Sequence, residues 1–162
     1  MKTTSTSSKA FWKYRKKIKT ITFGNVINIP NDISDEYKWD VSATGNGKVM
    51  AYITPNASDS SYYDLYIQGD GRLYANPDSS DLFYEFLYVD SINNIELLNT
   101  SKTTNMIRMF FATGYSAKTF NIGDLSNWDV SKVTTTSSMF YNAGFNATTF
   151  NIGDLSNWNT SN

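Results

Sequence analysis

The stretch that decides the fold is Phe-Asn-Ile-Gly-Asp-Leu-Ser-Asn-Trp, which occupies residues 120–128 and recurs unchanged at 150–158. The match extends upstream, where Met109-Phe110 aligns with Met139-Phe140, and 16 of the 30 positions in block 98–127 are identical in block 128–157. A fixed period of this size is typical of repeat architectures, in which each unit buries its apolar face by stacking on its neighbour. The sequence therefore favours binding on an extended surface over catalysis in a pocket.

Each repeat unit carries two different hydrophobic patterns in succession. Residues 103–110 place their apolar positions at i, i+3, i+6 and i+7, which predicts one face of a short helix, and residues 133–140 repeat this spacing. Residues 120–122 alternate apolar and polar side chains, which predicts a short strand. We expect Met139 and Phe140 to be buried between consecutive repeats.

The region upstream of the repeats is predicted to be mainly β structure. Residues 10–17 indicate a short basic helix, and the expected strands are 18–23, 49–53, 64–68 and 72–75. Gly69-Asp70-Gly71 predicts a tight hairpin between the last two strands, because glycine tolerates a positive φ. The segment beginning Pro77-Asp78-Ser79-Ser80 predicts the start of another short helix.

These patterns together predict an α+β fold. We expect a short solenoid of about 30-residue repeats, capped by an N-terminal antiparallel β region. The expected divisions are a flexible tail (1–9), an N-terminal helix plus β cap region (10–78), and solenoid repeats (79–162). Within the repeats we assign a degenerate unit (79–97), two clear units (98–127 and 128–157) and a stub (158–162).

The composition excludes several classes of function. The 162-residue chain has a net charge of −1 and contains no cysteine and no histidine. The commonest general base, the commonest metal ligand and all thiolate chemistry are thereby missing. We therefore expect no catalytic, metal or cofactor-binding residues and no enzymatic activity. No apolar run approaches the length of a membrane span.

We interpret the clusters of charged residues as structural features rather than as binding sites. Seven of the 14 basic residues lie in the first 20 positions, and we interpret this run as a capping helix with solvated charges rather than as a nucleic-acid or membrane site. Asp124, Asp129 and Asp154 are interpreted as turn and capping residues, because Ca²⁺ requires six to eight oxygen ligands.

Several stretches of the sequence resemble a known family. Residues 99–110, Asn-Thr-Ser-Lys-x-Thr-Asn-Met-x-x-Met-Phe, and residues 128–140, Trp-Asp-Val-Ser-Lys-Val-Thr-x-x-x-x-Met-Phe, resemble the repeat of BspA-type leucine-rich repeat surface proteins, the branch first described as a mycoplasma-type repeat of unknown function. Upstream, residues 39–42, 45–53, 65–71 and 79–83 are similar to the region that precedes such repeats. The resemblance implies a leucine-rich-repeat-like solenoid, a bacterial cell-surface location and a role in adhesion, and it brings no catalytic residues.

We therefore expect a non-catalytic binding or adhesion module at the bacterial cell surface. Its partner would be a protein or glycan on a host or neighbouring cell, and a partner chain or a second copy would cover the open C-terminal end. The alternative is a phage or virus-like particle component, such as a fibre, decoration or receptor-binding protein. Exposed aromatic rings suit such contacts, and the candidate contact residues are Tyr62, Tyr63, Phe111, Tyr115, Tyr141 and Phe145.

Overall fold

The computed structural model describes residues 11–161, so the expected tail at 1–9 lies outside the described part. Three short 3₁₀ helices are η1 (Phe11–Lys17), η2 (Asp35–Tyr37) and η3 (Ile95–Leu97). The strands are β1 (Ile18–Gly24), β2 (Lys38–Asp40), β3 (Val49–Pro55), β4 (Tyr63–Gly69), β5 (Leu73–Tyr74), β6 (Ser91–Asn93), β7 (Leu98–Asn99), β8 (Thr119–Asn121) and β9 (Thr149–Asn151). The predicted strands at 18–23, 49–53, 64–68 and 120–122 are confirmed as β1, β3, β4 and β8.

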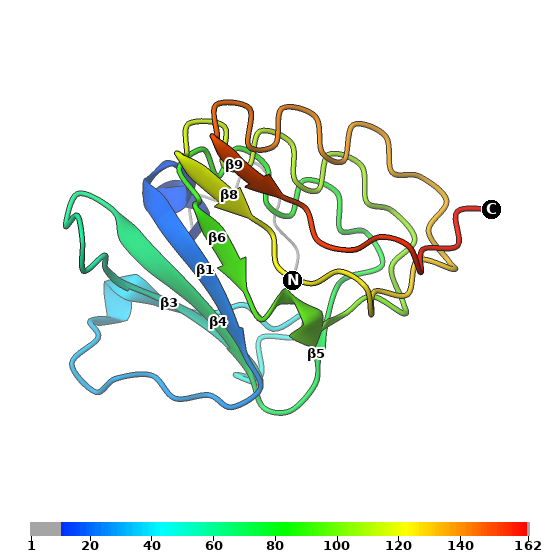
Figure 1. Cartoon of the computed structure of the whole chain (residues 1–162). Coiled ribbons are helices and arrows are strands. Elements are labelled where there is room, and N and C mark those ends of the chain that lie inside the picture. The colour runs from blue at the N-terminus through cyan, green and yellow to red at the C-terminus, as the bar shows by residue number, and fades with distance from the viewer. Residues whose placement is uncertain (1–10, 162) are drawn as a thin grey trace.

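One mixed sheet runs through the described chain in the order β2-β3-β4-β1-β6-β8-β9 (Figure 1). Strands β2, β3 and β4 are antiparallel neighbours, whereas β1 pairs in parallel with both β4 and β6. Strands β8 and β9 pair in parallel at an offset of one repeat, so that Phe120 stands opposite Phe150. The repeats thus extend the N-terminal sheet strand by strand.

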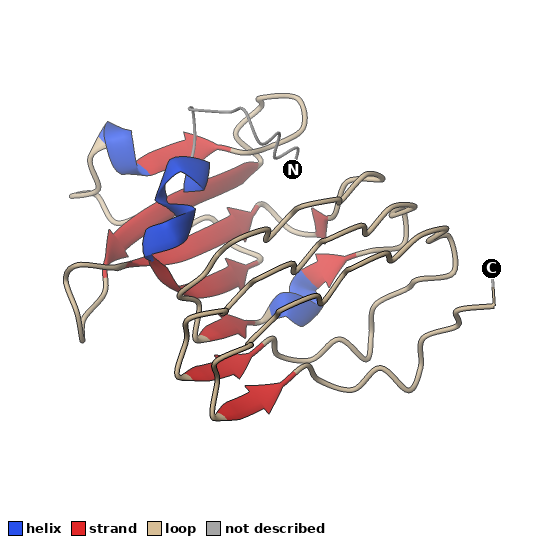
Figure 2. Cartoon of the chain, turned by 90° about the horizontal axis from the view of Figure 1, so that it is seen from above, coloured by secondary structure: helices blue, strands red, loops and turns tan. Residues whose placement is uncertain are grey.

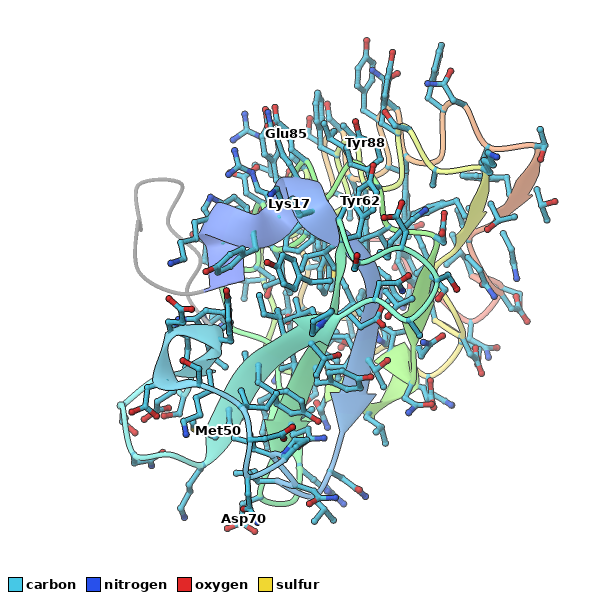
Figure 3. The ribbon with its side chains drawn as sticks, turned by 90° about the vertical axis from the view of Figure 1, so that its left-hand side faces the viewer. Lys17, Met50, Tyr62, Asp70, Glu85 and Tyr88 are labelled. Carbon is cyan, nitrogen blue, oxygen red and sulfur yellow. The ribbon has the colours of Figure 1, made fainter. Side chains whose placement is uncertain are left out.

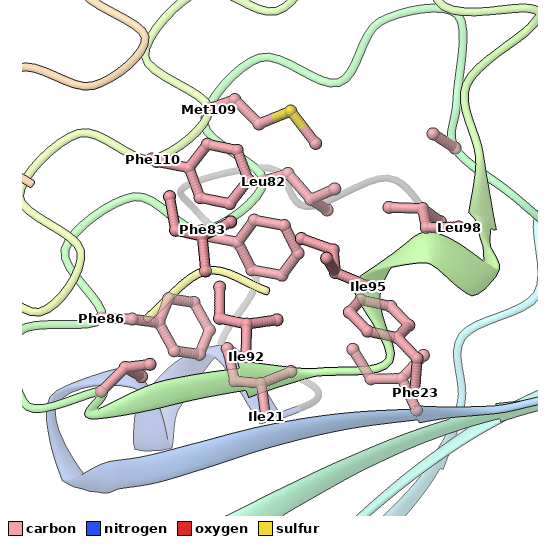
Figure 4. Close-up of a cluster of buried hydrophobic side chains, with 14 of the residues drawn as sticks. Ile21, Phe23, Leu82, Phe83, Phe86, Ile92, Ile95, Leu98, Met109 and Phe110 are labelled. Atoms are coloured by element: carbon pink, nitrogen blue, oxygen red, sulfur yellow. The ribbon is translucent and has the colours of Figure 1, made fainter. Parts of the chain in front are cut away.

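The core lies between this sheet and the turns that pass above it (Figures 2 and 4). Sheet residues Ile21 and Ile92 and the turn residues Phe83, Phe86 and Phe110 are each 0–1% exposed. Figure 4 shows the three phenylalanine rings above the two isoleucines. Such aromatic side chains each remove a large apolar area from water, so this layer contributes strongly to the driving force for folding.

The predicted fold class is wrong. Residues 11–161 form a mixed sheet with three short 3₁₀ helices and no α-helix, rather than an α+β solenoid of helix-containing repeats behind a separate antiparallel cap. The N-terminal region is not a purely antiparallel cap either, because β1 lies between two parallel partners. The basic segment predicted as a helix is the 3₁₀ helix η1.

Consecutive turns replace the helices predicted at 103–110, 133–140 and after Pro77. The N–H groups of Arg108 and Phe110 donate to the carbonyls of Ser137 and Met139 in the next repeat, at 3.0 and 2.9 Å. Between them, the N–H of Met109 donates to the carbonyl of Met106 at 3.2 Å. Half of the N–H groups therefore bond across repeats instead of along a helix. We call residues 79–88, 105–115 and 135–145 the turn ladder.

The turn ladder reproduces the spacing that predicted a helix. Residues with positive φ recur every four positions, at Arg108 and Ala112 in one repeat and at Ser138 and Asn142 in the next. A four-residue turn period places apolar side chains on one side almost as a 3.6-residue period does. The Thr and Ser content of these segments disfavours the helix itself, so hydrogen bonds between repeats decide the conformation.

The hairpin predicted at Gly69-Asp70-Gly71 is also wrong. Strand β5 does not return along β4 but pairs in parallel with β7, where Leu73 stands opposite Leu98. Glycine at position 71 has a φ of +94°, so the chain does turn there. The Leu73 side chain is buried over Gly69 at the end of β4, while the backbone of β5 pairs with the first repeat.

The expected burial between repeats holds for Met139, which is 3% exposed, and in part for Phe140, which is half-buried. Phe140 stacks on Phe110 with the ring centroids 5.4 Å apart. Phe150 on β9 is 51% exposed. The far side of the second repeat therefore presents apolar surface to solvent in this structure.

Candidate binding surface

Four of the six predicted contact residues lie in two columns of stacked rings on the turn ladder. In column A, Phe111 stacks with Tyr84 on one side and Tyr141 on the other, each at a centroid distance of 5.1 Å. In column B, Tyr115 and Phe145 stack at 5.2 Å with their planes 5° apart. The structure thus brings together residues that come from successive repeats.

The backbone explains the regular stacking. Phe111 and Tyr141 each close a turn that begins three residues earlier at a residue with positive φ. The N–H of Phe111 donates to the Arg108 carbonyl at 3.0 Å, and the N–H of Tyr141 donates to the Ser138 carbonyl at 3.1 Å. Hydrogen-bonded backbones lie about 4.8 Å apart. Equivalent side chains in adjacent repeats therefore meet at the distance at which aromatic rings stack.

The outermost rings are open to solvent. Tyr141 is 58% exposed and Phe145 is 64% exposed, whereas Phe111 and Tyr115 are half-buried beneath them. Large apolar side chains that gather in the open on one face indicate an interaction site more strongly than scattered ones do. The two columns together are called the aromatic face.

Tyr62 and Tyr63 pack against different parts of the molecule. Tyr62 lies against Tyr88 with centroids 5.2 Å apart, and Figure 3 shows these two side chains together on the side of the molecule where Glu85 also lies. Tyr63 instead packs against Tyr14 at 5.5 Å. The two residues are neighbours at the start of β4, where successive side chains point to opposite faces. Tyr62 therefore contacts the turn ladder through Tyr88, whereas Tyr63 contacts η1.

Tyr84 and Tyr88 are the residues that the sequence reasoning missed. The sequence does align this unit with the next repeat, because Leu82-Phe83 precedes Met109-Phe110 by 27 residues. The same offset places Tyr84 opposite Phe111, on which it stacks, whereas Tyr88 contacts Tyr62 from outside the repeats.

Charged groups border column A. The Arg108 guanidinium donates to both carboxylate oxygens of Asp81 at 2.8 and 2.9 Å, and this pairing raises the pKa of Arg108 above its ordinary value. The same guanidinium lies 5.6 Å from the ring centroid of Tyr84. Burial, and secondarily the neighbouring Glu85 carboxylate, raises the pKa of Tyr84. The Tyr84 hydroxyl is therefore engaged with the Glu85 carboxylate at the edge of column A.

A second cation stands at the Tyr62 end. The Lys19 ammonium lies 5.4 Å from the Tyr62 ring centroid and 2.8 Å from a carboxylate oxygen of Asp90. Cations over ring faces add modestly to the stability of an exposed aromatic group. The aromatic surface is therefore apolar in its middle and carries paired charges at its edge.

The repeated aspartates serve the turns, as predicted. Asp124, Asp129 and Asp154 each accept a hydrogen bond from the backbone N–H two residues later, at 2.8, 3.0 and 2.8 Å. Hydrogen bonds from the serine at that position, through its hydroxyl and its backbone, lower the pKa of all three. Within residues 11–161, no three acidic side chains gather closely enough to hold a metal ion. The same residues include no helix long and apolar enough to cross a membrane.

Comparison with known proteins identifies the repeat region. Neither the curated proteins nor the solved structures contain a match to this chain. A family model described as a Mycoplasma protein of unknown function, DUF285, matches residues 78–162, which is more than half of the chain and spans the turn ladder and strands β6, β8 and β9. The chain belongs to this Mycoplasma protein family of unknown function.

Proposed function

We propose that this chain is a non-catalytic binding module of a bacterial cell-surface protein related to the BspA-type repeat proteins, and that its aromatic face contacts a protein or glycan on another cell. The observation that carries the proposal is the exposure of Tyr141 and Phe145 at the ends of two ordered ring columns. The repeat motif of residues 128–140 supports the family relationship.

The stacked arrangement suits binding energetically. A ring that already rests on Phe111 or Tyr115 loses little conformational freedom when a ligand covers its other face. Tyrosine combines a large apolar area with a hydroxyl, a combination enriched at recognition surfaces. Arg108 and Glu85 border the rings and provide polar groups at the rim of the contact.

The test compares two variants that remove the same kind of side chain. In the first, Tyr141→Ala and Phe145→Ala truncate the outer ring of both columns. In the control, Phe150→Ala removes a ring of similar exposure that stacks on Phe120 at 5.9 Å but lies on strand β9. Both are applied with the natural chain to arrays of glycans and extracellular matrix proteins, and circular dichroism confirms that each is folded.

We expect the natural chain and the Phe150→Ala control to bind a common array component. The double variant should lose at least tenfold in affinity for it, because two aromatic anchors of an interface typically cost about 1–2 kcal/mol each when truncated. The proposal is refuted if no component binds saturably. It is equally refuted if the double variant binds as the natural chain does.

A further inference from the structure

A cavity of about 270 Å³ lies away from the aromatic face, between the sheet and the first repeat. Its floor comes from core residues of β1, β4 and β5 and from the first ladder segment, and the loop between β2 and β3 closes one side. The lining residues with apolar side chains are Phe23, Val41, Ala43, Val49, Ile67, Leu73, Tyr74, Ala75, Pro77, Leu82 and Leu98. Figure 4 shows Phe23, Leu82 and Leu98 in the core.

The polar side chains of this cavity are few and include two cations. Arg72 and Lys102 both line it and are otherwise exposed. Among residues 11–161, the ion pairs involve other basic residues, and neither of these two has an acidic partner. Within the described part of the chain, the lining of the cavity therefore includes two basic side chains and no carboxylate.

Lys102 is held close to this cavity. Its ammonium lies 4.9 Å from the ring centroid of Tyr74, a cavity-lining residue that is 44% exposed. Arg72 lies one residue before β5, two residues from Tyr74. A planar guanidinium can bind a carboxylate through two hydrogen bonds, and an ammonium nearby can add a third contact.

We propose that this cavity binds a medium-chain fatty acid, with the acyl chain among the apolar walls and the carboxylate between Arg72 and Lys102. The cavity has room for about nine groups the size of a water molecule, at roughly 30 Å³ each, which matches a chain of about eight carbons. Apolar cavities remain poor sites for water and take up apolar ligands readily. The two basic side chains would make the cavity bind a fatty acid more tightly than an uncharged chain of the same length.

The experiment titrates octanoate, and separately 1-octanol, into the full chain by isothermal calorimetry below the concentration at which octanoate forms micelles. The charge variant carries Arg72→Gln and Lys102→Met. The matched control carries Lys118→Met and Lys132→Met, two exposed lysines outside the cavity. A third variant, Ala43→Phe, fills the cavity from the loop between β2 and β3. Circular dichroism confirms that each variant is folded.

We expect one octanoate to bind per chain, and 1-octanol to bind roughly three- to tenfold more weakly. The charge variant should lose a similar factor for octanoate only, because two partly exposed charge contacts have that combined effect. The control should bind like the natural chain, and Ala43→Phe should bind neither compound. The absence of saturable octanoate binding overturns the proposal, as does equal octanoate affinity in the charge variant or in Ala43→Phe.

Discussion

The most direct test of the stacked repeats is the truncation of a single buried ring. Phe110 is fully buried and lies between Phe83, at 5.1 Å, and Phe140, at 5.4 Å, so it contacts an aromatic ring on both faces. Trp128 packs at 6.1 Å. Phe110→Ala would leave a cavity enclosed by three rings, one from the preceding unit and two from the following unit.

The expected loss in free energy of unfolding follows from these ring contacts. Truncating a fully buried phenylalanine to alanine typically costs about 3–5 kcal/mol, and the loss of two ring contacts places Phe110 in the upper part of that range. Phe140 is the equivalent residue of the next repeat, but it is only half-buried. Phe140→Ala should therefore cost roughly half as much, about 2 kcal/mol, because less apolar area leaves the interior.

Urea unfolding followed by circular dichroism measures both free energies of unfolding, and similar slopes in the two variants would show that the unfolded states are comparable. Phe145→Ala, at a site that is 64% exposed, serves as the control and should change the free energy of unfolding by less than about 1 kcal/mol. The packing described here is incorrect if Phe140→Ala costs as much as Phe110→Ala, or if Phe110→Ala costs less than about 1 kcal/mol.

Two further outcomes are expected from the same unfolding assay. Gly114→Ala should lower the free energy of unfolding by more than about 2 kcal/mol, because a Cβ at its φ of +66° would collide with the ring of Phe120. Gly45→Ala, at a φ of +64° with open space around it, should lower it by only about 1 kcal/mol. Similar losses in the two variants would contradict the close approach of Gly114 to Phe120. Hydrogen bonds from Ser131 hold the pKa of Asp129 below its ordinary value of 3.8, so its contribution is complete above that pH and is lost as the pH falls through the folded-state pKa. The free energy of unfolding should therefore drop between pH 4 and pH 2, and an unchanged drop in Asp129→Asn would show that this carboxylate has no part in it.

Several parts of the structure could be predicted because their causes are local or repeated. Alternating side chains in 18–23, 49–53 and 64–68 predicted strands that are present as β1, β3 and β4. The identical copies at 120–128 and 150–158 predicted equivalent positions, and Phe120 does pair with Phe150. The turn roles expected of Asp124, Asp129 and Asp154 are present, because a short carboxylate reaches a nearby N–H in almost any loop.

The candidate contact surface was predictable in part for the same reason. Phe111, Tyr115, Tyr141 and Phe145 occupy corresponding positions in two repeats, so a single stacking rule aligns both columns. Tyr62 comes from outside the repeats, and its contact with Tyr88 depends on where the loop before β4 ends. No sequence pattern near residue 62 predicts where that loop ends.

By itself the sequence determined the 30-residue period, the positions of the main strands and the aspartate turns, since each depends on neighbouring residues or on exact repetition. Only the tertiary structure decided that 103–110 forms turns instead of a helix, because the N–H groups of Arg108 and Phe110 find their acceptors in the next repeat. It also decided that β1 lies between β4 and β6, and that Arg72 and Lys102 meet at one cavity. These outcomes depend on contacts between segments far apart in the chain, and local propensity is too weak to specify such contacts.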